Sequence, residues 1–230
     1  RGEFLNLLME LSGNRFGRSL VFPGGVRFDL SDAQRLDFAK RLGAAERDLV
    51  RLADLVFETS GVASRFERAG PLAREVAEAL GLVGIAARAS GCDRDVRRDH
   101  PWGIYRFAHI PVAIASTGDV MARALLRAVE ARRSLAFVEE QVEELPGGRV
   151  AVGVPAARPE RAVVSLVEGW RGEIAHVAVS GRGGELAGYK VIDPSFHNWF
   201  GLAMAMRGQP ISDFPLCNKS FNLSYAGHDL

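Results

Sequence analysis

The chain has 230 residues, of which 47% are hydrophobic, which is enough for one large domain or two small ones with a substantial core. Lys and Arg number 29 against 28 Asp and Glu, and the resulting formal charge of +1 gives no electrostatic basis for binding nucleic acid. No apolar run approaches the roughly 18 residues that a membrane-spanning helix needs, and the N-terminus lacks the pattern of a signal peptide.

The two cysteines, Cys92 and Cys217, are far apart and belong to no CxxC or Cys/His pattern. This argues against a disulfide framework and against a zinc or iron–sulfur site held by this chain alone, and it indicates a reducing compartment. The sequence starts at Arg1, without a methionine, and enters an apolar helical pattern at once. We therefore expect further residues upstream.

The first part of the sequence has the spacing of helices. Leucines at helical intervals between residues 5 and 11 predict a helix that stops at Gly13. Ser31 followed by Gln34 is a capping box, and it predicts a long amphipathic helix that reaches about Gly61. The apolar stripe of this helix comprises Leu36, Ala39, Leu42, Leu49, Leu52 and Val56. A shorter helix is expected from Pro71, as an N1 proline, to Gly81.

A densely charged segment extends from Ala87 to Pro101. It contains Arg88, Asp93, Arg94, Asp95, Arg97, Arg98, Asp99 and His100. We interpret it as a turn and not as a core segment. Its Arg–carboxylate pairs could fix the turn while surplus cations face an anionic group or a polarised oxygen. The alternative is a solvated surface loop that pairs only with itself.

The remaining elements follow in order. Residues 102–115 are rich in aromatic and β-branched types and are expected to be extended, and a second long helix opens at Thr117 or Gly118 and ends before Pro146. From Val150 the period changes to two, which predicts an antiparallel meander of strands at 150–154, 162–168, 173–180 and 186–192. Asp193-Pro194 caps a helix over 195–207, and residues 211–230 are expected to be irregular.

These patterns predict an α+β fold that is mainly α, a bundle of long helices with a small antiparallel β region. We expect a single domain over residues 1–230, with a helical core over about 1–148 and the β-meander and C-terminal tail over about 149–230. None of the patterns by itself names a reaction.

Several segments, taken in order, resemble one known family. They are residues 7–15 (LLMELSGNR), 23–26 (PGGV), 84–91 (GIAARASG), 95–101 (DVRRDHP), 118–123 (GDVMAR), 168–173 (EGWRGE) and 206–208 (MRG). Together they resemble the large subunit of membrane-bound energy-converting nickel–iron hydrogenases, of the formate hydrogenlyase type. They also resemble the homologous quinone-site subunit of respiratory complex I (NADH dehydrogenase). The similarity runs from about residue 7 to the C-terminus and corresponds to the C-terminal portion of those proteins.

The resemblance also exposes a difference at the metal site. Hydrogenases of this family hold nickel and iron between two CxxC pairs, because soft thiolates are needed to retain and bridge the metals. In the C-terminal motif, roughly DPCxxCxxH, this sequence has Asn222 and Tyr225 where thiolates should be, and only His228 remains. Neither an amide nor a neutral phenol replaces a bridging thiolate. The resemblance therefore implies that this chain holds no metal.

In the homologous subunit of complex I, the nickel site is lost and the cavity that the metals would occupy is a quinone pocket. By analogy, the corresponding cavity of this chain would bind a quinone. The resemblance implies four catalytic residues: Arg97 and Arg98 would polarise a quinone oxygen or tune a neighbouring cluster, and Tyr225 and His228 would donate protons. The implied substrate-binding residues are Arg88, Asp95, Asp99, Glu168, Arg171 and Asn222. No cofactor would be held by this chain, quinone is the candidate substrate, and a 4Fe–4S cluster is expected on a partner subunit.

The implied partners are that iron–sulfur small subunit and the membrane-arm subunits of a complex I-like assembly, with no nucleic acid. The chain would be cytoplasmic, held peripherally on the inner face of the cell membrane by its partners. Its function would be electron transfer in a hydrogenase-like or NADH:quinone oxidoreductase-like complex. Two alternatives stay open: a scaffold subunit without chemistry, and an active hydrogenase if the alignment at Asn222 is shifted.

Overall fold

The computed structural model describes residues 2–229, which form two compact units. The first unit contains the chain up to Asp54 together with Ala131–Ala156, and the second contains Leu55–Glu130 together with the residues from Ala157 onward. The expectation of a single domain stays a prediction beside this division. The expected fold class is confirmed, because long helices dominate and the sheets are small and antiparallel.

The first unit is built mainly from helices. Its elements are α1 (Gly2–Ser12), β1 (Val21–Phe22), β2 (Gly25–Val26), most of α2 (Asp32–Glu58) and the last part of α7 (Val120–Glu143). The core of this unit consists of Leu7, Phe38, Leu42 and Leu135. The predicted capping box is confirmed: the Ser31 N–H donates to Gln34 Oε1 at 3.0 Å, and the Gln34 N–H donates back to Ser31 Oγ at 3.4 Å.

The predicted apolar stripe of α2 is only partly right. Leu42 is buried, but Leu36 is 75% exposed and Leu52 is 58% exposed, while Phe38 lies in the core. The predicted strand over 150–154 is reduced to one bridge between Gly25 and Ala151. Two adjoining hydrogen bonds, Val26 N to Val150 O and Val152 N to Gly24 O, support that bridge.

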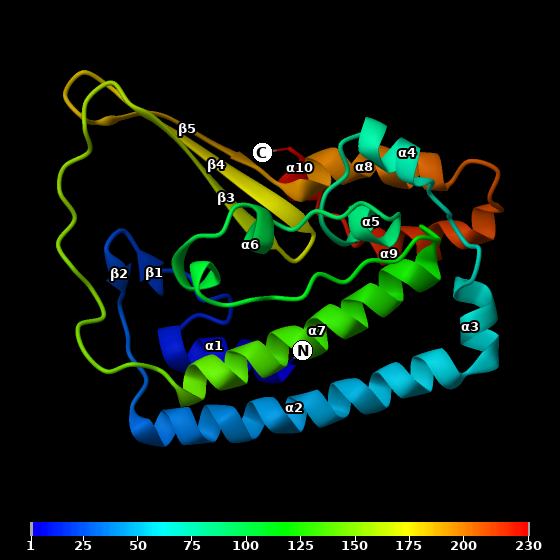
Figure 1. Ribbon diagram of the computed structural model, residues 1–230, viewed down its shortest axis with the longest axis horizontal. Coiled ribbons are helices and arrows are strands. Elements are labelled where there is room, and N and C mark those ends of the chain that lie inside the picture. Colours follow the sequence, from blue (N-terminus) through cyan, green and yellow to red (C-terminus); the bar gives the residue numbers. More distant parts are fainter. Residues whose placement is uncertain (1, 230) are drawn as a thin grey trace. The chain divides into compact units, whose positions relative to one another are not determined.

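The second unit combines short helices with a three-stranded sheet (Figure 1). Its helices, besides the first part of α7, are α3 (Ser60–Phe66), α4 (Arg74–Ala79), α5 (Gly84–Ala89), α6 (Val96–Asp99), α8 (Pro194–Ala205), α9 (Phe214–Phe221) and α10 (Tyr225–His228), with 3₁₀ turns at Gly103–Arg106 and Ile211–Asp213. The strands are β3 (Ala162–Gly169), β4 (Gly172–Ser180) and β5 (Leu186–Ile192) in the antiparallel order β3-β4-β5. The predicted meander and the Asp193 cap of α8 are both confirmed, and Asp193 Oδ1 accepts from the Ser195 N–H at 2.8 Å.

Two glycines bring α5 against the turn between β3 and β4. Gly84 has φ +64°, and a Cβ placed on it would lie 2.3 Å from the Gly172 Cα. Gly172 has φ +131°, and a Cβ placed there would lie 2.7 Å from the Gly84 N. Any side chain at either position would separate the two backbones. This contact places the start of α5 beside the β3–β4 turn, next to the paired Glu168 and Glu173.

Three predicted elements differ from those in the structure. The helix expected from Pro71 begins only at Arg74, because Leu72 donates its N–H to the Gly118 carbonyl at 3.1 Å and keeps that segment extended. Residues 102–115 contain a 3₁₀ turn instead of a strand. The tail, expected to be irregular, forms α9 and α10, since Cys217 and Phe221 pack into the core of the second unit.

None of the helices within residues 2–229 is both long and apolar enough to cross a membrane. This agrees with the absence of a long apolar run in the sequence.

Candidate functional site

Arg88 is the centre of a buried ionic cluster in the second unit. It lies near the end of α5, and its side chain is only 1% exposed. Its Nε and Nη2 atoms donate to the two carboxylate oxygens of Glu130 on α7, at 2.9 and 3.1 Å. Its Nη1 atom donates to Glu168 Oε1 on β3 at 2.9 Å and to the Arg94 carbonyl at 3.0 Å. Such fully paired geometry is what a buried guanidinium requires.

Asp95 completes the cluster from the start of α6. It caps that helix by accepting from the Arg97 N–H at 3.0 Å, and it also accepts from Arg97 Nε at 2.9 Å. Its carboxylate lies 3.6 Å from Arg88 Nη1. The interpretation of residues 87–101 as a turn outside the core is therefore wrong for Arg88 and Asp95. Both are buried, because carboxylates from distant elements meet Arg88 there.

Burial and ion pairing act in opposite directions on the acids of the cluster. Burial alone would raise the pKa of Asp95, but hydrogen bonds from Arg97 and the charge of Arg88 outweigh it and hold that pKa below the ordinary value. At Glu168 burial is the stronger effect, and the pKa is raised despite the Arg88 hydrogen bond. Glu168 also accepts from the Val96 N–H at 3.1 Å, so both of its oxygens are occupied.

Arg98 and Asp99 lie in a more exposed group beside the cluster. Arg98 donates from Nε to Asp99 Oδ1 at 2.7 Å and pairs through Nη1 with Asp93. The hydrogen bond from Arg98 holds the pKa of Asp99 below its usual range. Asp99 also accepts from the Asp95 N–H at 2.9 Å. This part of the segment matches the alternative of a surface loop that pairs with itself.

The predicted residues of the tail lie around α9 and α10. Asn222 has φ 54° and ends α9 in the left-handed conformation, and its carbonyl accepts from Arg171 Nε. Tyr225 is 69% exposed, with its ring centroid 5.1 Å from that of Trp199. The His228 ring centroid lies 5.8 Å from that of Phe196, and its Nδ1 atom is buried without a hydrogen-bond partner among the described residues.

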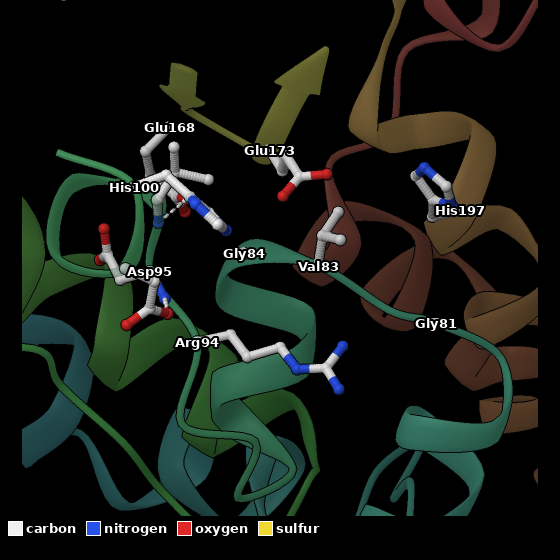
Figure 2. Close-up of a pocket in the computed structure, with 11 residues that line it drawn as sticks. Gly81, Val83, Gly84, Arg94, Asp95, His100, Glu168, Glu173 and His197 are labelled. Carbon is white, nitrogen blue, oxygen red and sulfur yellow. Dashed lines mark hydrogen bonds between the residues drawn. The ribbon is translucent and has the colours of Figure 1, made fainter. Parts of the chain in front are cut away.

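A cavity of about 450 Å³ opens between α5, α6, α8 and the β3–β4 turn (Figure 2). It brings three of the predicted substrate-binding residues together: Asp95, Asp99 and Glu168. The other predicted site residues are not part of its wall. The remaining lining consists of Gly81, Val83, Gly84, Arg94, Val96, His100, Glu173 and His197.

Four titratable residues of this wall were not named individually as site residues from the sequence. Arg94 and His100 belong to the charged segment 87–101, and Glu173 is the last residue of the EGWRGE segment. The sequence therefore already marked the segments in which these three residues lie. His197 had no such signal, because it reaches the cavity from α8 through the tertiary fold alone. Five of the eleven lining residues carry a charge, and Val83 and Val96 are the only branched apolar side chains among them, so the cavity can accept a charged group.

Comparison with known proteins gives the family. The sequence pattern of the family described as "Respiratory-chain NADH dehydrogenase, 49 Kd subunit" matches residues 1–158. The chain belongs to this family. The resemblance drawn from the sequence segments is thereby confirmed, and the relatives of this 49 Kd subunit family member include hydrogenase subunits as well.

The relatives are longer than this chain. Formate hydrogenlyase subunit 5 of Escherichia coli is 29% identical over 219 residues, which cover 95% of this chain and 38% of that protein. A subunit of the NADH-quinone oxidoreductase of Desulfotalea psychrophila is 27% identical over 219 residues, which cover 93% of this chain and 58% of that protein. This chain thus spans about two fifths to three fifths of the length of these relatives.

The fold has a solved counterpart. A chain in the structure of the membrane-bound sulfane sulfur reductase, an archaeal respiratory membrane complex, aligns with a TM-score of 0.92. The alignment covers 100% of this chain and 64% of the other, with 24% sequence identity. The likeness establishes a shared fold for the 49 Kd subunit family member.

The residues in hand do not fit a nickel–iron centre. Cys92 and Cys217 are buried in two different apolar clusters, so they offer no thiolate pair. Asn222 ends a helix, and the exposed Tyr225 ring packs on Trp199. Within residues 2–229, no group of three or more His, Cys, Asp or Glu side chains is arranged to hold a metal ion.

Proposed function

We propose that this chain is an electron-transfer subunit of a membrane-associated oxidoreductase of the complex I or hydrogenase type, and that it acts on a quinone without holding nickel. The observation that carries the proposal is the family match over residues 1–158, because that family contains the respiratory-chain subunit named above. The whole-chain fold match to a chain of a respiratory membrane complex supports it.

In this proposal the chain works beside an iron–sulfur small subunit whose 4Fe–4S cluster supplies the electrons. Membrane-arm subunits hold it peripherally at the inner face of the cell membrane. The relatives named as subunits, of a formate hydrogenlyase and of an NADH-quinone oxidoreductase, support the existence of partner chains.

The proton donors in this proposal are Tyr225 and His228. Reduction of a quinone to a quinol takes up two electrons and two protons, so the acceptor site needs proton donors as well as an electron source. Tyr225 is exposed, and the unpartnered Nδ1 atom of His228 is free of competing bonds within the described residues. Arg97 and Arg98, both held in carboxylate pairs, contribute positive charge rather than protons.

The test is a redox assay on the complex isolated with its own partner subunits. Electrons are supplied by reduced methyl viologen, and reduction of a soluble short-chain quinone is followed by absorbance. We expect Tyr225→Phe and His228→Ala to lower the rate at least tenfold without loss of assembly. Tyr189→Phe, which alters another largely exposed tyrosine, on β5, is the matched control and should leave the rate unchanged.

The scaffold function is a second candidate with an observation of its own. Arg88, Asp95, Arg97 and Glu168 satisfy one another within the buried cluster, which is how a purely structural ionic network behaves. Unchanged quinone reduction in both the Tyr225 and the His228 variants would establish the scaffold and reject the catalytic role.

The hydrogenase alternative is tested on the same preparation. Iron without nickel, and no hydrogen uptake, is the expected result. Stoichiometric nickel with hydrogen activity would show that the alignment at Asn222 and Tyr225 is shifted and that the chain is a working hydrogenase subunit.

A further inference from the structure

The cavity contains two charged groups that this chain leaves without a partner. Neither the Arg94 guanidinium nor the Glu173 carboxylate makes a hydrogen bond or an ion pair with any residue between 2 and 229. The neighbouring cations behave differently, since Arg88, Arg97 and Arg98 are each paired with a carboxylate of the same chain. The contrast leaves Arg94, which is exposed, and Glu173, which is half-buried, as charged groups of the cavity wall that are available to a ligand.

The position of Glu173 makes its lack of a partner costly. It is half-buried, and it lies directly opposite Glu168 in the antiparallel pairing of β3 with β4. Like charges at directly opposite positions destabilise a strand pair. Glu168 is neutralised by Arg88, whereas Glu173 faces the cavity without a cation. A basic group entering the cavity would relieve both the repulsion and the partial burial of this charge.

Arg94 gives the cavity a second, opposite charge. Figure 2 shows Glu173 and Arg94 on opposite sides of the Val83–Gly84 backbone, with His197 on the same side as Glu173. An occupant therefore needs a basic group and an acidic group at two separate points. Five of the eleven lining residues carry a charge, which favours charged side chains as the occupant.

We propose that this cavity is a docking socket for a partner protein, which places a lysine side chain against Glu173 and an acidic side chain against Arg94. Charge complementarity of this kind fixes the orientation of two subunits, and desolvated pairs at its centre slow their dissociation. The inference rests on the proposed function only in that the chain works within a multi-subunit complex.

The experiment uses the whole complex isolated with its partners. A zero-length carbodiimide reagent joins a carboxylate to a lysine in direct contact, and peptide mass spectrometry locates the bond. We expect a link between Glu173 and a lysine of another subunit, absent in Glu173→Gln. A Glu173 link to a lysine of this same chain would overturn the proposal, and so would a small zwitterionic molecule recovered from the cavity.

Salt tolerance gives a second, independent readout. We expect Glu173→Gln and Arg94→Gln each to lower, at least twofold, the salt concentration at which half of the chain leaves the complex. Glu75→Gln and Arg182→Gln, at exposed positions away from the cavity, are matched controls and should have no effect. Equal salt tolerance in all four variants would overturn the socket. A complex that shows this docking but no quinone reduction would reject the proposed function alone.

Discussion

Arg88 was expected to bind substrate because of its place in the charged segment, but in the structure it is the centre of a buried ionic cluster. Its position in a charged segment suggested a group facing a substrate, yet each of its three guanidinium nitrogens donates a hydrogen bond inside the protein. Its side chain is only 1% exposed, and three carboxylates converge on it. Here they come from α6, α7 and β3, elements separated by many residues in the sequence.

The first prediction concerns the contribution of Arg88 to the free energy of unfolding. We expect Arg88→Ala to lower the free energy of unfolding by roughly 3–5 kcal/mol, because it leaves Glu130 and Glu168 buried without their cation. Arg98→Ala, in an exposed pair, should cost less than about 1 kcal/mol. Urea denaturation followed by circular dichroism measures both. Equal losses in the two variants would contradict the assignment of Arg88 to a buried cluster.

The second prediction concerns pH. The folded-state pKa of Asp95 is lowered, so its contribution to stability is full above the unfolded pKa, near 3.8, and is lost as the pH falls through the folded pKa. Asp95→Asn removes that titration. The stability gap between the wild type and Asp95→Asn should therefore be largest near pH 6 and should shrink below pH 4.

The raised pKa of Glu168 affects the pH dependence of stability in the opposite direction. The contribution of Glu168 to the free energy of unfolding is full at low pH and declines as the pH rises through its folded-state pKa. Wild type and variant both keep Glu168, so their difference reports mainly on Asp95. A gap that stays constant from pH 6 to pH 3 would show that Asp95 is not stabilised as an anion.

At the scale of elements, the ends of helices depend on particular side chains. Ser31 and Gln34 start α2, and Asp193 starts α8 with Pro194 in the first turn. Asn222 ends α9 because its left-handed backbone, which asparagine and glycine tolerate best, lets the Asn222 N–H donate to the Asn218 carbonyl at 2.9 Å. This capping role needs no substrate.

The third prediction separates capping from chemistry at Asn222. We expect Asn222→Gly to keep both stability and quinone reduction, and Asn222→Ala to lower the free energy of unfolding by about 1 kcal/mol through the left-handed penalty. Thermal unfolding and the viologen-to-quinone assay measure the two effects. Loss of quinone reduction in a stable Asn222→Gly complex would instead support the implied substrate-binding role.

At the scale of the whole molecule, the chain divides into two units, and the segment between α7 and β3 passes from one to the other. This segment has no helix or strand beyond the single bridge at Ala151, and most of its residues are exposed. Exposed irregular segments are where proteases cut first.

The fourth prediction is that brief trypsin treatment cleaves this segment first, after Arg149. The exposed Arg149 precedes Val150, whereas Arg158 precedes Pro159 and resists the enzyme. Mass spectrometry of the first fragments should show that cut before any in α8. Arg149→Gln is the matched control and should delay the first cleavage several-fold. Initial cleavage within a helix would contradict the assignment of the segment.

The local signals of the sequence were sufficient for the caps at Ser31 and Asp193, for the three strands of the meander and for the family, because each depends on residues close together or on an ordered set of short segments. They failed for the tail, where α9 and α10 form because Cys217 and Phe221 are buried against distant elements. They also misplaced two of the six residues of the α2 stripe, since Leu36 and Leu52 are exposed although their spacing is helical.

The candidate site shows the same division. The sequence by itself determined which charged residues cluster along the chain, and it placed Asp95, Asp99 and Glu168 among the candidates. Only the tertiary structure decided that Arg88 is sealed by Glu130 and Glu168, and that Glu173 and His197 reach the cavity from β4 and α8. Charge pairing over long sequence distances is set by how elements pack. A pattern of charges therefore predicts that an ionic site exists, and packing decides which of its members stay free to bind.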